Sequence, residues 1–311
     1  METNDSIVLL GATMVDYIGF ADDKFKKGTS NPGHLKMSTG GVGHNIAVNL
    51  ARLGDKVDFF TGIGNDEDGD KLLAEMQNEG INVFYPERKY PSSTYLAVLD
   101  EKGDLQGGVS DARATEAINL KFLQKHDELI RSHLYLFLDT NLAPVTIADI
   151  LRYYPEKKLC VEAVSKAKAK KIKRFLPRIY LIKGNKEELR SLTSLKKDAS
   201  GEDIVNELRK TGVQNAIATA GKDGIYFASP FETRHIPAVD INQEKVISVI
   251  GAGDALYSGF IHGFIRGWNF TEALKFGELL ADEVLISKEA TARSIGKYRD
   301  YDPSAKKKKN D

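Results

Sequence analysis

A run of small residues followed by an acid stands late in the chain, at Gly251-Ala252-Gly253-Asp254, directly ahead of an amphipathic stretch. If these residues open a helix, their backbone N–H groups lie unpaired at its N-terminus, where the helix dipole favours an anion. Asp254 then lies in the first turn, where a carboxylate can accept a proton from a hydroxyl while the amides stabilise a phosphoryl group in transfer. An ordinary helix start with an acid in its first turn is the alternative.

A second glycine-rich stretch, residues 40–43, is followed by His44 and Asn45. Glycine lets a ligand approach the backbone closely, and the Asn45 amide can both donate to and accept from a polyol. The spacing fits neither a dinucleotide-binding fingerprint nor a Walker A loop. The stretch predicts either a polyol-binding turn or a plain turn before a helix, and in both cases we expect His44 to be an exposed first-turn histidine.

Two further motifs follow predicted strands. Asn185 and Glu188 are three residues apart at a helix start, where they can organise a hydrated magnesium ion or form a capping box. Thr219, Gly221 and Gly224 form a glycine-rich turn that can approach phosphate oxygens, or an ordinary hairpin turn. Asp16 lies beyond the first predicted strand and can bind vicinal hydroxyls or cap a loop.

The chain has 311 residues, 41% of them hydrophobic and 28% charged, a mix typical of a soluble globular protein with a large core. Basic and acidic residues number 44 each, which argues against a nucleic-acid partner. The single cysteine, Cys160, excludes an intrachain disulfide, and its apolar neighbours predict a buried strand position. No signal or membrane-spanning segment is recognisable, so we expect a cytoplasmic protein with no membrane partner.

Short apolar runs alternate with helical patterns along the chain. This alternation predicts an α/β fold with a mostly parallel central sheet flanked by helices, and ligands beyond the carboxyl ends of its strands. The expected strands are residues 6–11, 57–61, 83–85, 133–138, 159–164, 180–182, 215–219 and 225–228. The expected helices are residues 45–53, 68–78, 145–153, 166–175, 186–192 and 202–210.

Two segments interrupt the alternation. Residues 16–38 have no helical pattern, and residues 93–110 are typical of a β-hairpin with a turn at 100–104. We therefore expect a small β lid formed by about 16–38 and 93–112. Residues 1–300 should form a single domain, and residues 301–311, with their lysine run, a charged flexible tail.

The order of these motifs is more specific than any one of them. Over residues 6–287 it resembles the ribokinase-like (PfkB) carbohydrate kinases, a family with a three-layer fold, and residues 40–54 and 249–260 match its two signature stretches. Within that family the chain is most similar to the pseudouridine kinases, at residues 30–33, 40–50, 95–100, 139–141 and 164–168.

The resemblance implies a kinase that uses ATP and magnesium to phosphorylate a hydroxyl, in that subgroup the ribose 5′-hydroxyl of pseudouridine. It also implies roles for individual residues, carried over position by position. Asp254 would be the base and Gly251, Ala252 and Gly253 the anion hole; Asp16, Gly40, Gly41 and Asn45 would bind the sugar; Asn185, Thr219, Gly221, Gly224 and Gly253 would bind ATP, and Glu188 would hold magnesium through water.

Recognition of the base falls to the lid, where we expect Asn31, Tyr95 and Asp111 to reach the ring of the substrate. The alternative for Asn31 is a structural turn, because Asn-Pro-Gly is turn chemistry. Ribose, adenosine, fructose or a sugar acid stays open as the acceptor, and so does a non-catalytic sugar- or nucleotide-binding regulator on the same fold. The family resemblance further implies a homodimer through the lid.

Several positions depart from the family pattern. Ser248 and Ile250 stand where the family usually has an acid or amide and a threonine, which argues against its usual potassium site and predicts weak activation by potassium. His44 replaces an arginine usual in the subgroup, and Gly184 replaces the proline that usually precedes Asn185.

Overall fold

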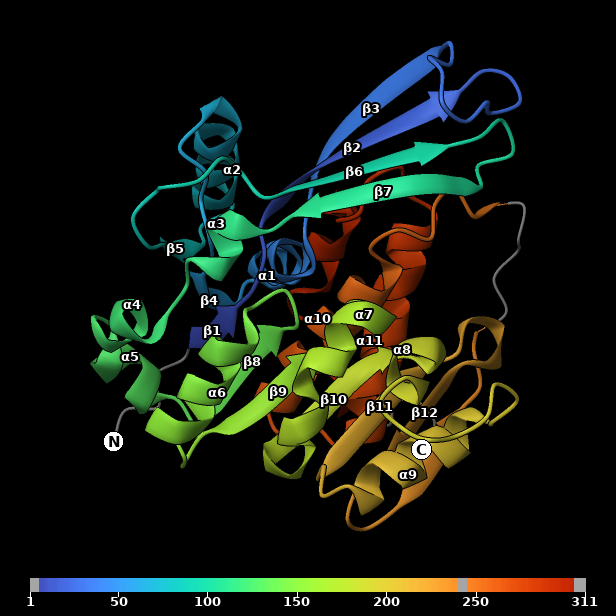
Figure 1. Cartoon of the computed structure of the whole chain (residues 1–311). Coiled ribbons are helices and arrows are strands. Elements are labelled where there is room, and N and C mark those ends of the chain that lie inside the picture. The colour runs from blue at the N-terminus through green and yellow to red at the C-terminus, as the bar shows by residue number, and fades with distance from the viewer. Residues whose placement is uncertain (1–5, 240–244, 305–311) are drawn as a thin grey trace.

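The computed structural model describes residues 6–239 and 245–304, which build a large main sheet and a smaller lid sheet (Figure 1). The main sheet is parallel from β5 to β11, and β12 and β13 extend one edge in antiparallel fashion. Its strands, in spatial order, are β5 (Asn82–Phe84), β4 (Lys56–Phe60), β1 (Ser6–Leu10), β8 (Tyr135–Asp139), β9 (Lys158–Glu162), β10 (Ile179–Asn185), β11 (Asn215–Thr219), β12 (Ile225–Ala228) and β13 (Thr233–Ile236).

Helices cover both faces of the main sheet because its strands are apolar on both sides. In β1, Ile7 and Leu9 face one core, and Val8 and Leu10 face the other. The first core is closed by α1 (Val42–Arg52), α2 (Glu67–Asn78), α10 (Ala252–Ile265) and α11 (Phe270–Leu285). The second is closed by α4 (Leu120–Gln124), α5 (Asp127–Ser132), α6 (Pro144–Tyr153), α7 (Lys166–Ala169), the 3-10 helix η1 (Lys170–Arg178), α8 (Lys186–Arg190) and α9 (Gly201–Lys210).

The lid is a separate four-stranded sheet, at the top of Figure 1. Its order is β3 (Gly33–Gly40), β2 (Met14–Ala21), β6 (Thr94–Leu99) and β7 (Leu105–Asp111). The pairs β3–β2 and β6–β7 are antiparallel hairpins, and β2 and β6 join them in parallel. Because β2 begins just beyond the end of β1 and β3 leads into α1, the lid is attached at the carboxyl edge of the main sheet.

The alternation of strands and helices, the mostly parallel sheet and the lid are confirmed. The helix predicted at residues 166–175 is wrong from residue 170 on, where the chain continues as η1. Pro177, near the end of η1, lacks the N–H group that an α-helical bond to Lys173 would need. The short helices α3 (Arg113–Glu116), α4 and α5 were not predicted, since four to six residues are too few to show a helical period. Two elements near the end, β13 and α11, were also missed, although Asn269 caps α11 as a helix start signal.

The packed body continues past residue 300. Tyr301 stacks on Phe276 with ring centroids 4.7 Å apart and also contacts Trp268, so the expected tail does not begin at 301. The lysine run of that tail falls in residues 305–311, outside the described residues. Across the described parts of the chain, every helix is too short or too polar to span a lipid bilayer.

The start of α1 lies in close contact with the end of β1. Gly41 precedes α1 with a φ of 95°, a conformation that favours glycine, and an added Cβ would lie 2.5 Å from the Ala12 carbonyl oxygen. At Gly43 an added Cβ would lie 2.9 Å from the Cα of Gly11. The glycines at 41 and 43 are therefore required by backbone packing.

We expect Gly43→Ala to lower the free energy of unfolding by about 1–3 kcal/mol, because the new methyl group would push two backbone segments apart. Urea titration followed by circular dichroism measures this change. Gly107→Ala is the matched control, since its added Cβ meets nothing within 4 Å, and it should change stability by less than about 0.5 kcal/mol. Equal stability of the two variants would contradict the packing constraint.

Candidate active site

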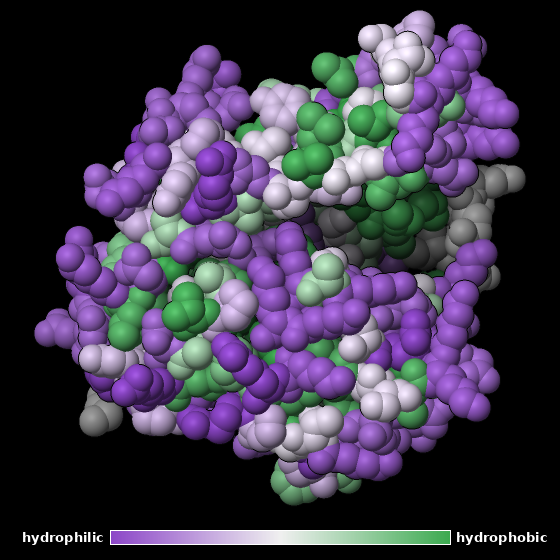
Figure 2. All heavy atoms as spheres, viewed as in Figure 1, coloured by the Kyte–Doolittle hydropathy of each residue, from purple (hydrophilic) through white to green (hydrophobic). Residues whose placement is uncertain are grey.

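Polar side chains gather at the carboxyl edge of the main sheet, beneath the lid. Asp139 is the last residue of β8, Glu162 is the last residue of β9, and Lys183 lies near the end of β10. The three residues occupy one register row across these strands. Figure 2 shows the surface hollowed between the lid strands and the body. This edge is where ligands bind in open α/β sheets.

Asp254 lies in the first turn of α10, directly after the glycine run that the sequence singled out. Gly251 precedes the helix with a φ of 83°, and an added Cβ there would lie 2.1 Å from the carbonyl oxygen of Ala290. Asp66, Ser200 and Asn269 cap α2, α9 and α11, whereas no side chain of the described residues caps α10. The Ala252 N–H donates to the Val249 carbonyl oxygen at 3.4 Å, and the next N–H groups have no capping side chain, so an anion bound there stays a prediction.

The Asp254 carboxylate is held by the sugar-binding candidate Asn45. The Asn45 side-chain amide donates to Asp254 Oδ2 at 2.7 Å, which brings two stretches 209 residues apart into contact. Burial raises the pKa of Asp254 to about 6, opposed by the charge of Lys183 and by the bond from Asn45. Such a carboxylate is ionised near neutral pH and can still accept a proton.

Asp139 fixes the backbone around these groups. Its Oδ2 accepts the N–H groups of Ala12 and Gly43, both at 3.0 Å, and its Oδ1 accepts the N–H of Asn141 at 2.8 Å. The carboxylate is fully buried, and burial raises its pKa. Asp139 thus joins the end of β1 to the first turn of α1, and sequence reasoning did not predict this role.

Lys183 is a buried cation that sequence reasoning missed. Its Nζ lies 3.1 Å from both carboxylate oxygens of Glu162 and donates to the carbonyl oxygen of Gly253 at 3.1 Å. Burial raises the pKa of Glu162, and the charge of Lys183 opposes that rise. The available signal was a lysine within the apolar strand that precedes Asn185, because a lysine is almost never fully buried without a partner.

Asp16 and Lys168 form a second polar group, on the lid side. Burial raises the pKa of Asp16 to about 6, and the charge of Lys168 opposes it. Asp16 also lies against Gly40, where an added Cβ would sit 2.4 Å from its Oδ2. Lys168 is hydrogen bonded through its Nζ to Asn141 Oδ1, and burial lowers its pKa.

The turn between β9 and α7 is strained. Val164 has a φ of 58° and is the one non-glycine residue with positive φ in the described chain. A β-branched residue is rarely found in this conformation, and such strain concentrates at functional sites. The turn lies between Glu162 and Lys168, so it joins the two polar groups.

The three base-reading candidates on the lid are not brought together. Tyr95 is in register with Asp16 and shares its face of the lid sheet, whereas Asp111 pairs with Thr94 and so faces the other way. Asp111 is instead bonded to Arg113, which lowers its pKa. The Asn31 side chain bonds to backbone atoms of Lys26 and Thr29, which agrees with the turn alternative.

Asn185 and Glu188 form a complete capping box at the start of α8. Asn185 Oδ1 accepts the N–H of Glu188 at 2.9 Å, and Glu188 Oε2 accepts the N–H of Asn185 at 2.7 Å. The Glu188 charge also contributes to the raised pKa of Asp254 and of Glu162, so it lies close enough to act on both. No cluster of three metal-ligating side chains occurs in residues 6–239 and 245–304, and a magnesium ion bound through water and phosphates needs none.

The turn after β11 presents open backbone beside this box. Thr219 pairs with Asn185 across the parallel strands. Gly221 has a φ of 56° and nothing within 4 Å of an added Cβ, whereas Gly224 is buried against the backbone of Ile236. Gly221 is therefore accessible to a ligand, and Gly224 shapes the turn.

The expected exposure of His44 is wrong. Its side chain is 1% exposed because α1 is covered on all sides by β1, β4 and α10, and burial lowers its pKa. The nearest acid is Glu75, 3.9 Å from His44 Nε2. Ser248 accepts the N–H of Ile250 through its hydroxyl at 3.2 Å, and the Ile250 side chain is exposed.

Comparison with known proteins gives one family. The model of the pfkB family carbohydrate kinases matches residues 4–295. The chain is 29% identical to the pseudouridine kinase of Escherichia coli (strain K12), over 89% of this chain and 90% of that protein. It is 27% identical to the guanosine-inosine kinase of Exiguobacterium acetylicum, over 92% and 96%. The ribokinase structure from Thermotoga maritima superposes with a TM-score of 0.80 at 22% identity, covering 94% and 98%.

The raised pKa values of Asp254 and Asp16 predict an acid limb in the pH dependence of activity. Both carboxyls take up a proton as the pH falls through about 6, so kcat/KM should fall from about pH 8 to about pH 5. In the same window the folded chain binds more protons than the unfolded chain, so these two groups lower stability as the pH rises. Asp16→Asn leaves one of the two carboxyls, so the plot of log kcat/KM against pH should reach a limiting slope of one on its acid side. An unchanged slope would contradict the assignment of the acid limb to Asp16 and Asp254.

Proposed function

The chain belongs to the pfkB family of carbohydrate kinases, and from this premise we propose that it phosphorylates the ribose 5′-hydroxyl of pseudouridine to give pseudouridine 5′-phosphate. That it is an ATP-dependent phosphotransferase acting on a hydroxyl follows from the family. The observation that carries the mechanism is the Asn45–Asp254 contact, which brings the sugar candidate and the candidate base within 2.7 Å.

In the proposed reaction Asp254 accepts the proton of the attacking hydroxyl. The hydroxyl oxygen forms a bond to the γ-phosphorus of ATP, the bond from that phosphorus to the β–γ bridging oxygen breaks, and ADP leaves. The N–H groups at the start of α10 stabilise the charge on the transferring group, because no side chain of the described residues caps them. Asn45 orients the carboxylate through its hydrogen bond.

Lys183 and Glu188 complete the phosphate side. Lys183 donates a hydrogen bond to the Gly253 carbonyl oxygen and so fixes the position of the anion hole. Its ion pair with Glu162 offsets the positive charge of the lysine. Glu188 has one carboxylate oxygen outside the capping box, and this oxygen would hold a magnesium ion through water. When bound, magnesium supplies charge neutralisation for the phosphates.

Pseudouridine as the acceptor is supported by two observations. The first is the likeness to the pseudouridine kinase of Escherichia coli, which extends over nearly the whole of both chains. The second is that Asn141 and Lys168 add an amide and an ammonium group beside the sugar-binding candidate Asp16, and a base with N–H and carbonyl groups needs such partners. Because Asn31 and Asp111 are engaged elsewhere, we place base recognition on these two side chains and on Tyr95.

The test is a phosphorylation screen with ATP and magnesium against pseudouridine, uridine, guanosine, adenosine, ribose and fructose. We expect pseudouridine to have the highest kcat/KM. Lys168→Met should lower kcat/KM for pseudouridine more than it lowers kcat/KM for ribose, so the ratio of the two values should fall. Equal or better efficiency with ribose in the unmodified chain would reject pseudouridine and leave a general sugar kinase.

Asp254→Asn is the control for catalysis within this screen. It keeps the shape of the side chain, and we expect it to bind ATP with unchanged affinity while kcat falls by about two to four powers of ten on every acceptor. Full activity of this variant would reject Asp254 as the base. If the unmodified chain phosphorylates none of the acceptors, a non-catalytic binding protein is favoured.

We further propose that two copies of the chain associate through the lid. The face opposite Asp16 carries an exposed apolar row across its strands, with Met37 56%, Leu96 46% and Val109 67% exposed. The edge strands β3 and β7 also have no neighbour on their outer sides within the described sheet, so their outer backbone groups are open to pairing. A second lid would cover both features.

Sedimentation at micromolar concentration tests the association, and we expect a dimer. Val109→Asp should give a monomer, because a charge would replace the centre of the apolar contact. Phe231→Asp is the matched control: Phe231 is 94% exposed on another part of the molecule, and this variant should stay dimeric. A monomeric unmodified chain would reject the proposal.

A further inference from the structure

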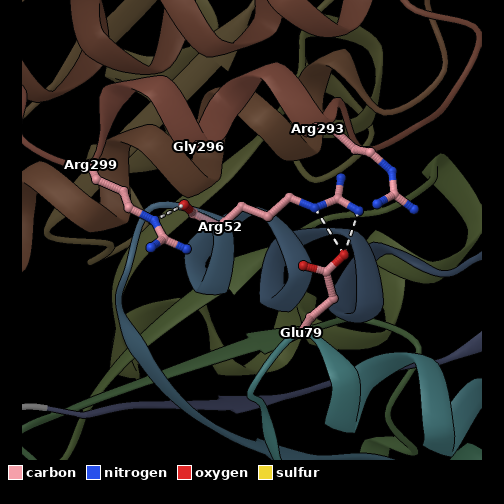
Figure 3. A pocket seen from close by; sticks show the side chains of 5 residues that line it. All are labelled: Arg52, Glu79, Arg293, Gly296 and Arg299. Atoms are coloured by element: carbon pink, nitrogen blue, oxygen red, sulfur yellow. Dashed lines mark hydrogen bonds and ion pairs between the residues drawn. The ribbon is translucent and has the colours of Figure 1, made fainter.

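A pocket rich in arginine lies at the opposite end of α1 from the sugar candidate Asn45. It has a volume of about 320 Å³ and is lined by Arg52, Glu79, Arg293, Gly296 and Arg299 (Figure 3). These residues come from three elements that meet there: the end of α1, the end of α2 and the 3-10 helix η4 (Arg293–Tyr298). None of them has a part in the phosphoryl transfer described above.

The one acid of this pocket is already engaged. Glu79 Oε1 accepts from Arg52 Nε at 3.1 Å and from Arg52 Nη2 at 2.6 Å. Arg52 Nη1 donates to the carbonyl oxygen of Thr291 at 2.6 Å, so this buried guanidinium is bonded on three of its nitrogens. Glu79 and Arg52 therefore balance each other and leave the other two arginines without an acid.

The Nη groups of Arg293 and Arg299 have no partner within the described residues. Arg293 makes no hydrogen bond or ion pair there, and Arg299 uses only its Nε, which donates to the Arg52 carbonyl oxygen at 2.9 Å. Figure 3 shows the Arg293 side chain beside the guanidinium of Arg52, with Arg299 at the other end of the Arg52 residue. Arg293 and Arg299 thus add two positive charges to a concave surface whose one lining acid, Glu79, is already paired with Arg52.

We propose that this pocket binds a phosphate group, as free phosphate or on a small phosphorylated compound. A guanidinium presents paired N–H donors that match the oxygens of phosphate, and several arginines around one cavity are suited to a compact anion with more than one charge. The volume lies at the lower end of the range for small-molecule sites, which fits a phosphate with a small substituent.

The pocket is separate from the phosphoryl-transfer site but linked to it by packed backbone. Arg52 and Asn45 lie seven residues apart on α1, a rise of roughly 10 Å. The carbonyl of Thr291, which Arg52 holds, directly follows Ala290, whose carbonyl oxygen abuts Gly251 at the start of α10. Because the two sites lie at opposite ends of α1, binding at the pocket can be measured while the nucleotide site is occupied.

Isothermal titration calorimetry of the full chain tests the site, with a non-hydrolysable ATP analogue and magnesium saturating the nucleotide site. We expect inorganic phosphate or ribose 5-phosphate to bind, and Arg293→Ala to weaken that binding roughly tenfold. Arg293→Ala combined with Arg299→Ala should abolish it. Tighter binding of phosphate identifies the free ion as the ligand, and tighter binding of ribose 5-phosphate identifies a phosphorylated compound.

Lys297→Ala is the matched control, because it removes a positive charge from the same 3-10 helix but pairs with Glu283 outside the pocket. It should leave the affinity unchanged. Arg293→Ala alone keeps the test valid if the double variant unfolds, since this side chain makes no hydrogen bond among the described residues. No binding of either probe up to about 10 mM, or equal binding by Arg293→Ala and the unmodified chain, would overturn the proposal.

Discussion

The site depends first on one buried carboxylate. Asp139 accepts N–H groups from Ala12 and Gly43, and this pair of bonds brings the end of β1 and the start of α1 into contact. The contact leaves no room for side chains at Gly11, Gly41 and Gly43. Because α1 begins at this contact, the contact determines the direction of the helix and the position of Asn45. The position of Asn45 in turn allows its hydrogen bond to Asp254.

A balance of charge is the second constraint. Asp254, Glu162 and Asp139 are three acids with raised pKa values at one edge of the sheet, and the charge of Lys183 opposes that rise at Asp254 and Glu162. The same lysine bonds to the Gly253 carbonyl oxygen, so the group that offsets the acids also fixes the anion hole. Removing Lys183 would therefore change the electrostatics and the geometry of the site together.

Much of the fold could be predicted from the sequence because it depends on local patterns. Apolar runs such as residues 6–11 are long enough to indicate buried strands, and Gly251 with Asp254 marked the start of α10. The contacts between distant segments could not be predicted in this way. Lys183 is one charge in an apolar strand, and its partner Glu162 lies on another strand. Asp111 was misplaced because a shift of one residue in the lid register reverses the face.

The two ends of α1 have a consequence for how the chain can vary in length. Asn45 near its start bonds to α10, and Arg52 at its end bonds to Glu79 and Thr291, so both ends are held by tertiary contacts. One inserted residue would rotate everything beyond it by about 100° around the helix axis. Either Asn45 or Arg52 would then point away from its partners. Insertions and deletions in related chains should therefore fall in the loops that flank α1, and the eight residues from Asn45 to Arg52 should vary by substitution alone.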